Sequence, residues 1–273
     1  LLTHSAGVPF TVNLTQGQIF NGLGALTGSV GNVFSAVDLT GTKIESIASG
    51  TGVCKRIAVF SGSGKINITC GDNNNGARSS DNYMVQNFPK DAWGKKFLTA
   101  PTQVLDRNIF RICVSDPAAI VKVNNQPVTN FGPLTSSFYY EVPQTNQPLK
   151  IESNLPITVA QYISSSGGCG NPDDLGDPEV IYLSPVEQNI SDIIWNATPN
   201  EFITNHFVNA IIPNGGTGIS SFRFDGAVQP IGAFLVHPQD PNYSIFTKSF
   251  VNTNNRTYHT ATSDSGFNAI AYG

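Results

Sequence analysis

A phrase that recurs along the chain is the feature that most limits how it can fold. Residues 43–46 read Lys-Ile-Glu-Ser and, after a loop, residues 56–62 read Arg-Ile-Ala-Val-Phe-Ser-Gly. Residues 150–162 join both parts in one run, and residues 258–273 give a looser third copy. The copies lie about 110 residues apart, which is too long for a solenoid repeat and suits one small β-domain. The repetition therefore predicts one architecture used about three times, with the first copy incomplete.

The composition favours β-structure for each copy. Only 12% of the 273 residues are charged, which is about half the usual share, and 26 are glycine. Thr and Val fill strands, while Asn and Gly accept the positive φ angles of tight turns. Runs of four to seven apolar or alternating residues are separated by turn signals roughly every ten residues. We therefore expect an all-β fold of tandem β-sandwich-like modules with little or no helix.

The copies set the expected domain boundaries. Residues 1–93 form a first β-module plus connector, residues 94–203 a second module plus connector, and residues 204–273 a third module. Each connector precedes an apolar strand that ends in proline. Because the chain starts inside a strand-like run, we expect it to be a portion of something longer.

Local patterns add four expectations. The alternation at 10–20 predicts a half-buried hairpin, and the run Ile57 to Phe60 predicts a strand covered on both faces. Asp225-Gly226 is a strong signal for a two-residue hairpin turn, standing where Asn124-Asn125 stand in the second copy. The best helix candidate is Ser191 to Trp195, which is too short to be stable alone.

Several function classes find no support in the sequence. The net charge of −4 gives no basic surface for nucleic acid, and no apolar run reaches the roughly 18 residues of a membrane span. Gly62-Ser63-Gly64-Lys65 does not match a phosphate-binding loop, because the preceding glycine and following hydroxyl are missing. The histidines lack zinc spacing, and no serine nucleophile motif occurs.

Four cysteines leave two interpretations open. They are unpaired buried thiols, or they form disulfides in an oxidising compartment. Cys54 and Cys70 flank a hairpin-like unit, while Cys113 and Cys169 both lie in the second copy. The preferred pairing is therefore 54 with 70 and 113 with 169.

An acidic loop is the candidate metal site. Asp173, Asp174 and Asp177 lie close together, and their carboxylates repel one another unless solvent or a cation separates them. The loop is either simply solvated or a structural calcium site. No other cofactor is expected.

Aromatic and paired charged residues are the remaining candidates. Trp93 and Trp195 stand at the ends of connectors, where they either plug the seam between modules or stack on a sugar. Glu45 and Glu152 recur beside Lys43 and Lys150, which predicts a structural salt bridge in each copy and not an acid/base pair.

The ordered phrases resemble the N-terminal domain of the IgG Fc-binding protein, a family found in mucus proteins and in many secreted or surface-anchored bacterial proteins. The matching phrases, in chain order, are residues 56–62, 85–89, 93–97, 156–162, 177–178, 184–188, 207–213 and 266–273. The resemblance implies an extracellular, non-catalytic adhesive or structural domain at the cell surface or in a matrix or filament. Ser80-Asp81-Asn82 and Val85 replace the Asp-His pair and the Glu of the family pattern. Immunoglobulin binding is not carried over, because these motifs define no residues for it.

Two functional hypotheses follow. The first is a secreted or cell-surface adhesive domain that binds a protein, a glycan or copies of itself through its loops and unpaired strand edges. The second is a carbohydrate-active enzyme that uses carboxylates among Asp173, Asp174, Asp177 and Glu187, which would need a concave pocket with two carboxylates roughly 5 to 10 Å apart.

Overall fold

The computed structural model describes residues 2–30, 33–48, 50, 52–70, 79–105, 107–134, 138–172, 175–199, 203–252 and 257–273. Contacts within the chain divide it into two units, Leu1–Thr42 and Lys43–Gly273.

The first unit holds one short antiparallel pair, β1 (Leu26–Val30) and β2 (Val33–Ala36). The hairpin predicted at 10–20 is wrong: the chain turns around Gly17, whose φ is 83°, but residues 10–20 form no strand. The large apolar side chains there, including Phe10 and Phe20, are exposed. Alternation alone did not make a hairpin, because an isolated two-stranded pair is at best marginally stable in water.

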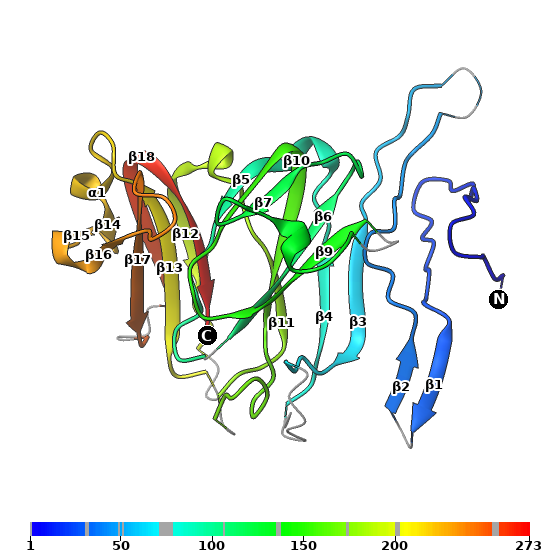
Figure 1. Cartoon of the computed structure of the whole chain (residues 1–273), viewed down its shortest axis with the longest axis horizontal. Coiled ribbons are helices and arrows are strands. Elements are labelled where there is room, and N and C mark those ends of the chain that lie inside the picture. Colours follow the sequence, from blue (N-terminus) through cyan, green and yellow to red (C-terminus); the bar gives the residue numbers. More distant parts are fainter. Residues whose placement is uncertain are drawn as a thin grey trace. The chain divides into compact units, whose positions relative to one another are not determined.

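The second unit contains a two-stranded hairpin followed by two seven-stranded sheets (Figure 1). The hairpin is β3 (Phe60–Ile66) and β4 (Asp81–Gln86). The first sheet consists of β5 (Gly94–Leu98), β6 (Asn108–Val114), β7 (Val121–Val123), β8 (Gln126–Pro127), β9 (Tyr139–Thr145), β10 (Lys150–Ile163) and β11 (Glu179–Tyr182). The second consists of β12 (Ile190–Asn196), β13 (His206–Pro213), β14 (Arg223–Phe224), β15 (Ala227–Val228), β16 (Phe234–Val236), β17 (Tyr243–Phe250) and β18 (Tyr258–Tyr272).

The two large sheets share the order of their central strands. The order is β8-β7-β10-β6-β9 in the first and β15-β14-β18-β13-β17-β16 in the second. In each sheet, the strand that comes first in the chain lies outside this order and pairs with the long strand: β5 pairs with β10, and β12 pairs with β18. The long strands β10 and β18 are therefore equivalent, as the repeated phrase predicts.

The equivalence of β10 and β18 holds residue by residue. Ile151 pairs with both Phe97 and Val123. Ala261, 110 positions later, pairs with both Ile193 and Phe224. Beyond a break in register, Ile157 pairs with Gly94, and Phe267 pairs with Ile190. One shift of 110 positions thus relates the two strands on both sides of the break.

Equivalent hairpin turns confirm the turn predictions. Asn124 and Asn125 have φ values of 52° and 67° between β7 and β8, and Asp225 and Gly226 have 53° and 79° between β14 and β15. Two successive positive φ angles match the twist of a two-residue hairpin, and Asn, Asp and Gly tolerate them best. The third copy therefore replaces Asn-Asn by Asp-Gly without changing the turn.

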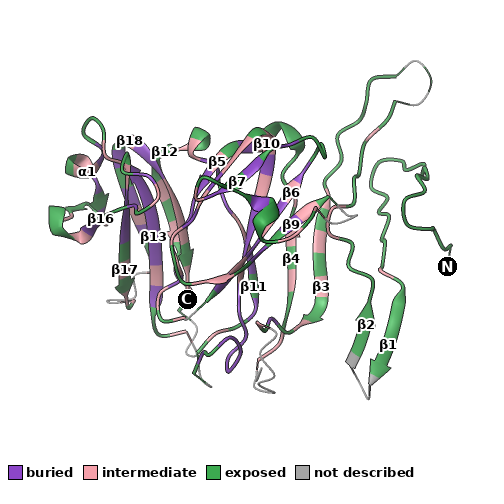
Figure 2. Cartoon of the chain, in the orientation of Figure 1, coloured by how far each residue is buried: buried purple, intermediate pink, exposed green. Residues whose placement is uncertain are grey.

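Buried residues concentrate in the two large sheets (Figure 2). Alternate residues of β6 face the first core, whose side chains are mainly aliphatic, including Ile112, Ile151 and Val159. The second core is built largely on five phenylalanines, which are Phe222, Phe224, Phe234, Phe246 and Phe267. A smaller apolar cluster joins the two sheets through Leu98, Ala100, Ile211 and Ile245.

The structure corrects two finer expectations. Ser191 to Trp195 is not helical but lies in β12, because Ile193 and Trp195 face the second core and the backbone pairs with β18. This strand precedes the expected boundary at 203, so the second sheet begins at Ile190. The counterpart of β5 is accordingly β12, and β13 is the counterpart of β6.

The all-β expectation is confirmed. In the described residues, helix is limited to α1 (Gly218–Ser221) and four 3-10 turns, η1 (Lys90–Ala92), η2 (Val128–Asn130), η3 (Val186–Gln188) and η4 (Ile231–Ala233). Within those residues, none of the helices has the length and apolar character needed to cross a membrane.

Candidate binding surface

The two tryptophans are half-buried against their own module. The Trp93 indole N–H donates to the Phe88 carbonyl at 3.2 Å, where η1 meets β5. The Trp195 ring lies within 5.8 to 6.5 Å of the rings of Phe224, Phe250 and His259. These contacts lie within one module, so the seam between modules and sugar stacking both stay predictions.

The acidic loop lies partly outside the described residues, since Asp173 and Asp174 are not among them. Partial burial and the nearby Asp81 carboxylate raise the pKa of Asp177, and the Ser79 hydroxyl opposes this effect. In the described part of the chain, no three His, Cys, Asp or Glu side chains gather as metal ligands would. The calcium site stays a prediction.

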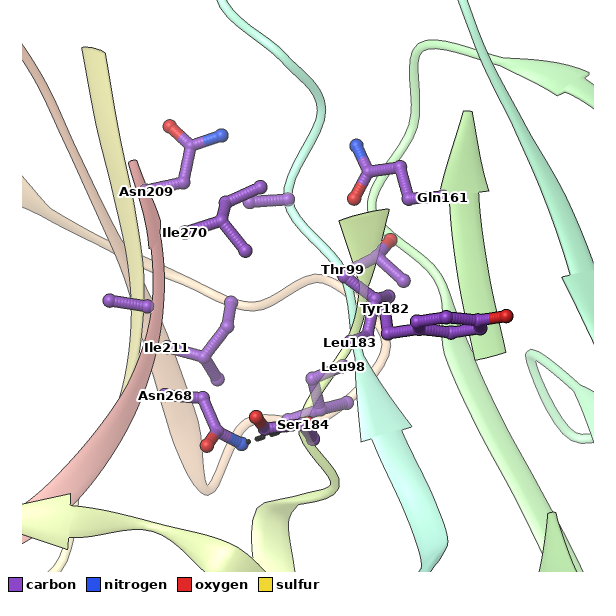
Figure 3. Close-up of a pocket in the computed structure, with 12 residues that line it drawn as sticks. Leu98, Thr99, Gln161, Tyr182, Leu183, Ser184, Asn209, Ile211, Asn268 and Ile270 are labelled. Atoms are coloured by element: carbon purple, nitrogen blue, oxygen red, sulfur yellow. Dashed lines mark hydrogen bonds between the residues drawn. The ribbon is translucent and has the colours of Figure 1, made fainter. Parts of the chain in front are cut away.

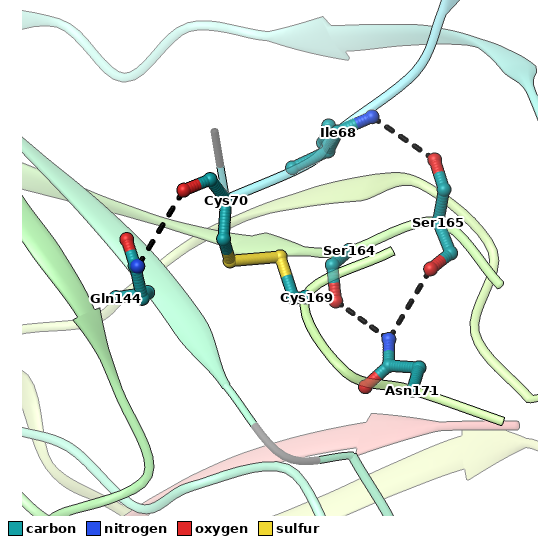
Figure 4. Close-up of a disulfide and its surroundings, with 7 residues drawn as sticks. All are labelled: Ile68, Cys70, Gln144, Ser164, Ser165, Cys169 and Asn171. Carbon is teal, nitrogen blue, oxygen red and sulfur yellow. Dashed lines mark hydrogen bonds between the residues drawn. A yellow bond between two sulfur atoms is a disulfide. The ribbon is translucent and has the colours of Figure 1, made fainter. Parts of the chain in front are cut away.

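The predicted cysteine pairing is wrong. Cys70 is bonded to Cys169, with their Cα atoms 4.9 Å apart (Figure 4). Cys54 is exposed, and Cys113 lies on β6 opposite Thr158; both remain thiols. Proximity in sequence did not predict the partner of Cys70, because the path of the loop after β10 determines which cysteine lies next to it.

Hydrogen bonds around the disulfide fix that path. Ile68 donates its N–H to the Ser165 hydroxyl and accepts from the Ser165 N–H, both at 3.0 Å. The Asn171 amide holds the loop closed through the Ser164 hydroxyl at 2.7 Å. The segment after β3 is thus tied to the end of β10 by a covalent bond and by hydrogen bonds.

The predicted salt bridges are present in both copies. Lys43 and Glu45 approach to 2.7 Å in an exposed setting, and Lys150 and Glu152 to 3.1 Å in a more buried one. Glu187 has a structural contact too, because its carboxylate accepts the Lys95 N–H at 3.1 Å. Of these carboxylates, that of Glu187 links its connector to β5, while those of Glu45 and Glu152 make contacts within one segment.

The two buried residues His206 and His259 also make structural contacts. His259 Nδ1 lies 2.8 Å from the Asp225 carboxylate, and its Nε2 lies 3.2 Å from the Asn252 side-chain oxygen. The same Asn252 contacts His206, whose pKa is lowered by burial and by the charge of His259. Both ring nitrogens of His259 are occupied, so the group anchors the Asp225 turn.

The hairpin of β3 and β4 carries the feature that sequence reasoning missed. Phe60, Gly62, Met84 and Gln86 lie on one face, because Phe60 pairs with Gln86 and Gly62 with Met84. We call these four residues the hairpin face. All four are exposed.

Two of the equivalent residues of the second copy, Ala160 and Val180, are buried. The Asn87 N–H bonds to the Val59 carbonyl just as the Leu183 N–H bonds to the Val159 carbonyl, both at 2.9 Å. This match places Met84 at the position of Val180, and Met84 is 79% exposed while Val180 is 7% exposed. Aligning the connectors of the copies residue by residue would have identified Met84 and Val180 as equivalent, but not their difference in burial.

The repeated phrase shows the same contrast. Ile57 is 50% exposed, whereas Ile157 and Phe267 are fully buried. In the described residues, β3 pairs only with β4, so its other edge carries no strand where β10 carries β6. An apolar face beside unpaired backbone groups suits binding of a polypeptide.

Comparison with known proteins agrees with this picture. No curated protein and no solved structure matches the chain. The model of one family, described as IgGFc binding protein, matches residues 2–273 and carries no information on organism. This is a family of binding proteins, and the match covers nearly the whole chain, so the chain belongs to the IgGFc binding protein family.

Proposed function

We propose that this chain is a non-catalytic extracellular domain that binds a protein partner, in an adhesive or structural role, through the hairpin face. The observation that carries the proposal is the exposure of Phe60 and Met84 where the second copy buries Ala160 and Val180. Exposed apolar residues that a homologous module covers are the expected mark of a contact surface.

Two further observations support this assignment. The Cys70–Cys169 disulfide fits an oxidising compartment outside the cytosol. The family takes its name from binding the Fc part of IgG, so Fc is one candidate partner and a second copy of the chain is another.

The test compares the double variant Phe60→Ser/Met84→Ser with the wild-type chain. One arm measures binding to immobilised Fc fragment, and the other measures self-association by sedimentation over a range of concentrations. We expect one arm to be positive and the double variant to weaken it by about 30-fold, the effect of losing a central apolar contact.

The matched control is Ile194→Ser, which removes an equally exposed apolar side chain from β12. It should leave binding unchanged. Equal loss in the control would contradict the assignment to the hairpin face. A signal on a glycan array with both protein arms silent, or silence in all three, would overturn the proposed protein binding.

A further inference from the structure

The seam between the two large sheets leaves little room for a partner. Figure 3 shows the pocket there, which is lined in part by Leu98, Ile211 and Asn268. Its cavity volume of about 50 Å³ holds only a few water molecules. In the part of the chain that the structure describes, a macromolecular partner therefore has to bind on an exposed face or edge of the sheets.

The strands that end the two sheets differ in character. β9 ends the strand order of the first sheet and carries Glu141 and Pro143, a charge and a proline that discourage pairing with a further strand. β16 ends the order of the second sheet and reads Phe-Leu-Val. Pro230 and Pro238 flank it, but no Asp, Glu, Lys or Arg occurs from residue 226 to residue 239. The second sheet thus has a short apolar edge without a charge to protect it.

The backbone of β16 has groups available for pairing. The His237 N–H bonds to the Tyr243 carbonyl at 2.9 Å. Since backbone groups alternate in direction along a strand, Leu235 also faces β17, while Phe234 and Val236 face outward. The Phe234 N–H is already bonded within the turn η4. Among the described residues, no hydrogen bond uses the Phe234 carbonyl or the Val236 N–H. The edge therefore offers one acceptor and one donor, two residues apart.

The side chains beside this edge are apolar and exposed. Leu235 is 67% exposed and Val236 is 60% exposed, on opposite faces of the strand. Ile231, in the turn before the strand, is exposed too, although Val128 at the start of the equivalent turn η2 is buried in the first core. Both turns follow a Gln-Pro pair. Covering these aliphatic side chains would be favourable, which suits a partner strand and not solvent.

We propose that β16 pairs in antiparallel fashion with β16 of a second copy of this chain, about a two-fold axis at Leu235. In this register the Val236 N–H of each copy donates to the Phe234 carbonyl of the other, and the two Leu235 side chains face each other. An edge with one donor and one acceptor two residues apart is complementary to itself in reverse. Because the segment is uncharged, the pairing brings no like charges together, although each chain has a net charge of −4.

The expected association is weak and is separate from the hairpin face. Three residues bury less surface than a standard interface, so we expect a dissociation constant on the order of 100 µM. Sedimentation of the full chain at up to about 1 mM should show a monomer–dimer equilibrium. The hairpin-face variant Phe60→Ser/Met84→Ser should leave this equilibrium unchanged.

Charged variants test the edge in solution. Leu235→Lys removes an apolar contact and places two like charges opposite each other, so the dimer should weaken at least about tenfold. Ile194→Lys adds the same charge at a similarly exposed position of β12 and should leave the dimer unchanged. Leu235→Glu should also be monomeric by itself. An equimolar mixture of Leu235→Lys and Leu235→Glu should associate again, because opposite charges then face each other.

Cysteine variants in a Cys54→Ser background test the register. Leu235→Cys places two sulfurs opposite each other, where Cα atoms lie about 4.5 Å apart and a disulfide can form. Val236 stands opposite Phe234 of the other copy, so the Cα atoms of a Val236→Cys pair lie about 7 to 8 Å apart, which is too far. After mild oxidation, a non-reducing gel should show at least about tenfold more covalent dimer for Leu235→Cys.

Four results would overturn the proposal. The first is a chain that stays monomeric at the highest concentration, and the second is equal cross-linking of the two cysteine variants. The third is a mixture of the Lys and Glu variants that does not associate. The fourth is a dimer that Leu235→Lys leaves intact. If Phe60→Ser/Met84→Ser dissociates that dimer, self-association belongs to the hairpin face, and the proposed function stands without this inference.

Discussion

The two seven-stranded sheets share the order of their central strands and the register of their long strands, but they fill their cores differently. Where the first sheet pairs Ile151 with Val123, the second pairs Ala261 with Phe224. The larger side chain of the pair is on the long strand β10 in the first sheet and on the short strand β14 in the second. The pair therefore fills the space between the two strands in both sheets. The fold therefore depends on the pattern of inward positions and on matched volumes across strands, and not on particular residues.

In the N-terminal copy, the repeated phrase is not packed in this way. Ile57 is half exposed where Ile157 is buried. The difference between the copies shows that the phrase becomes a buried strand only where neighbouring strands cover it.

The largest effect is expected for the disulfide, which ties the segment after β3 to the end of β10. Cys70→Ser/Cys169→Ser opens a loop closed by residues 99 positions apart, which should lower the free energy of unfolding by about 4 to 5 kcal/mol. Urea denaturation without reductant measures the loss. Cys54→Ser, at an exposed thiol, should change nothing, and an equal loss there would show that the bond itself is not responsible.

Ile57 and its equivalent Ile157 test whether the first copy contributes less to stability than the second. Ile157→Ala should cost about 2 to 5 kcal/mol, because it leaves a cavity in the first core. Ile57→Ala should change stability by less than about 0.5 kcal/mol. Comparable losses in the two variants would mean that the first copy is covered in solution.

The pair Ala261 and Phe224 tests whether side-chain volumes are matched across neighbouring strands. Ala261→Ile should overpack the second core against Phe224 and cost about 1 to 3 kcal/mol. Adding Phe224→Val recreates the pair found in the first sheet and should recover part of that loss. Strict additivity of the two single variants in chemical denaturation would argue against compensation.

The smallest effect is a pH dependence at the junction of the sheets. His237 donates from Nε2 to the Thr99 carbonyl, and its Nδ1 accepts the Gln239 N–H. Burial lowers its pKa below the usual 6.5 despite the nearby Asp240 carboxylate, so the unfolded chain binds the proton first. Stability should therefore fall as the pH drops from about 7.5 to about 5.5.

The His237→Asn variant should show a smaller fall over that range, since Asn can still accept the Gln239 N–H. Thermal melts at several pH values provide the measurement, and exposed His4→Asn is the control. A steeper fall in His237→Asn would mean that the histidine is not the group that titrates.

Much of the fold could be read from the sequence because it is repeated. The phrases at 150–162 and 258–273 identified equivalent strands, and Asp225-Gly226 identified a hairpin turn, since both signals are local. Ser191 to Trp195 was misassigned, because its alternation spans too few residues to separate strand from helix without knowing that β18 lies alongside.

The candidate binding surface was harder to predict from the sequence. The partner of Cys70 depends on where the loop after β10 leads, and that loop is fixed by the Ile68 and Ser165 contacts. The exposure of Met84 is a relation between copies. It becomes visible only when the burial of Val180 in the second copy is known.

The disulfide also changes how the chain would respond to a pulling force. Tension applied on either side of Cys70 and Cys169 passes through the sulfur–sulfur bond and bypasses the 99-residue stretch that the bond closes. About 330 to 350 Å of chain length is thereby withheld from extension. The first sheet would keep most of its strands under a load that unravels its neighbours.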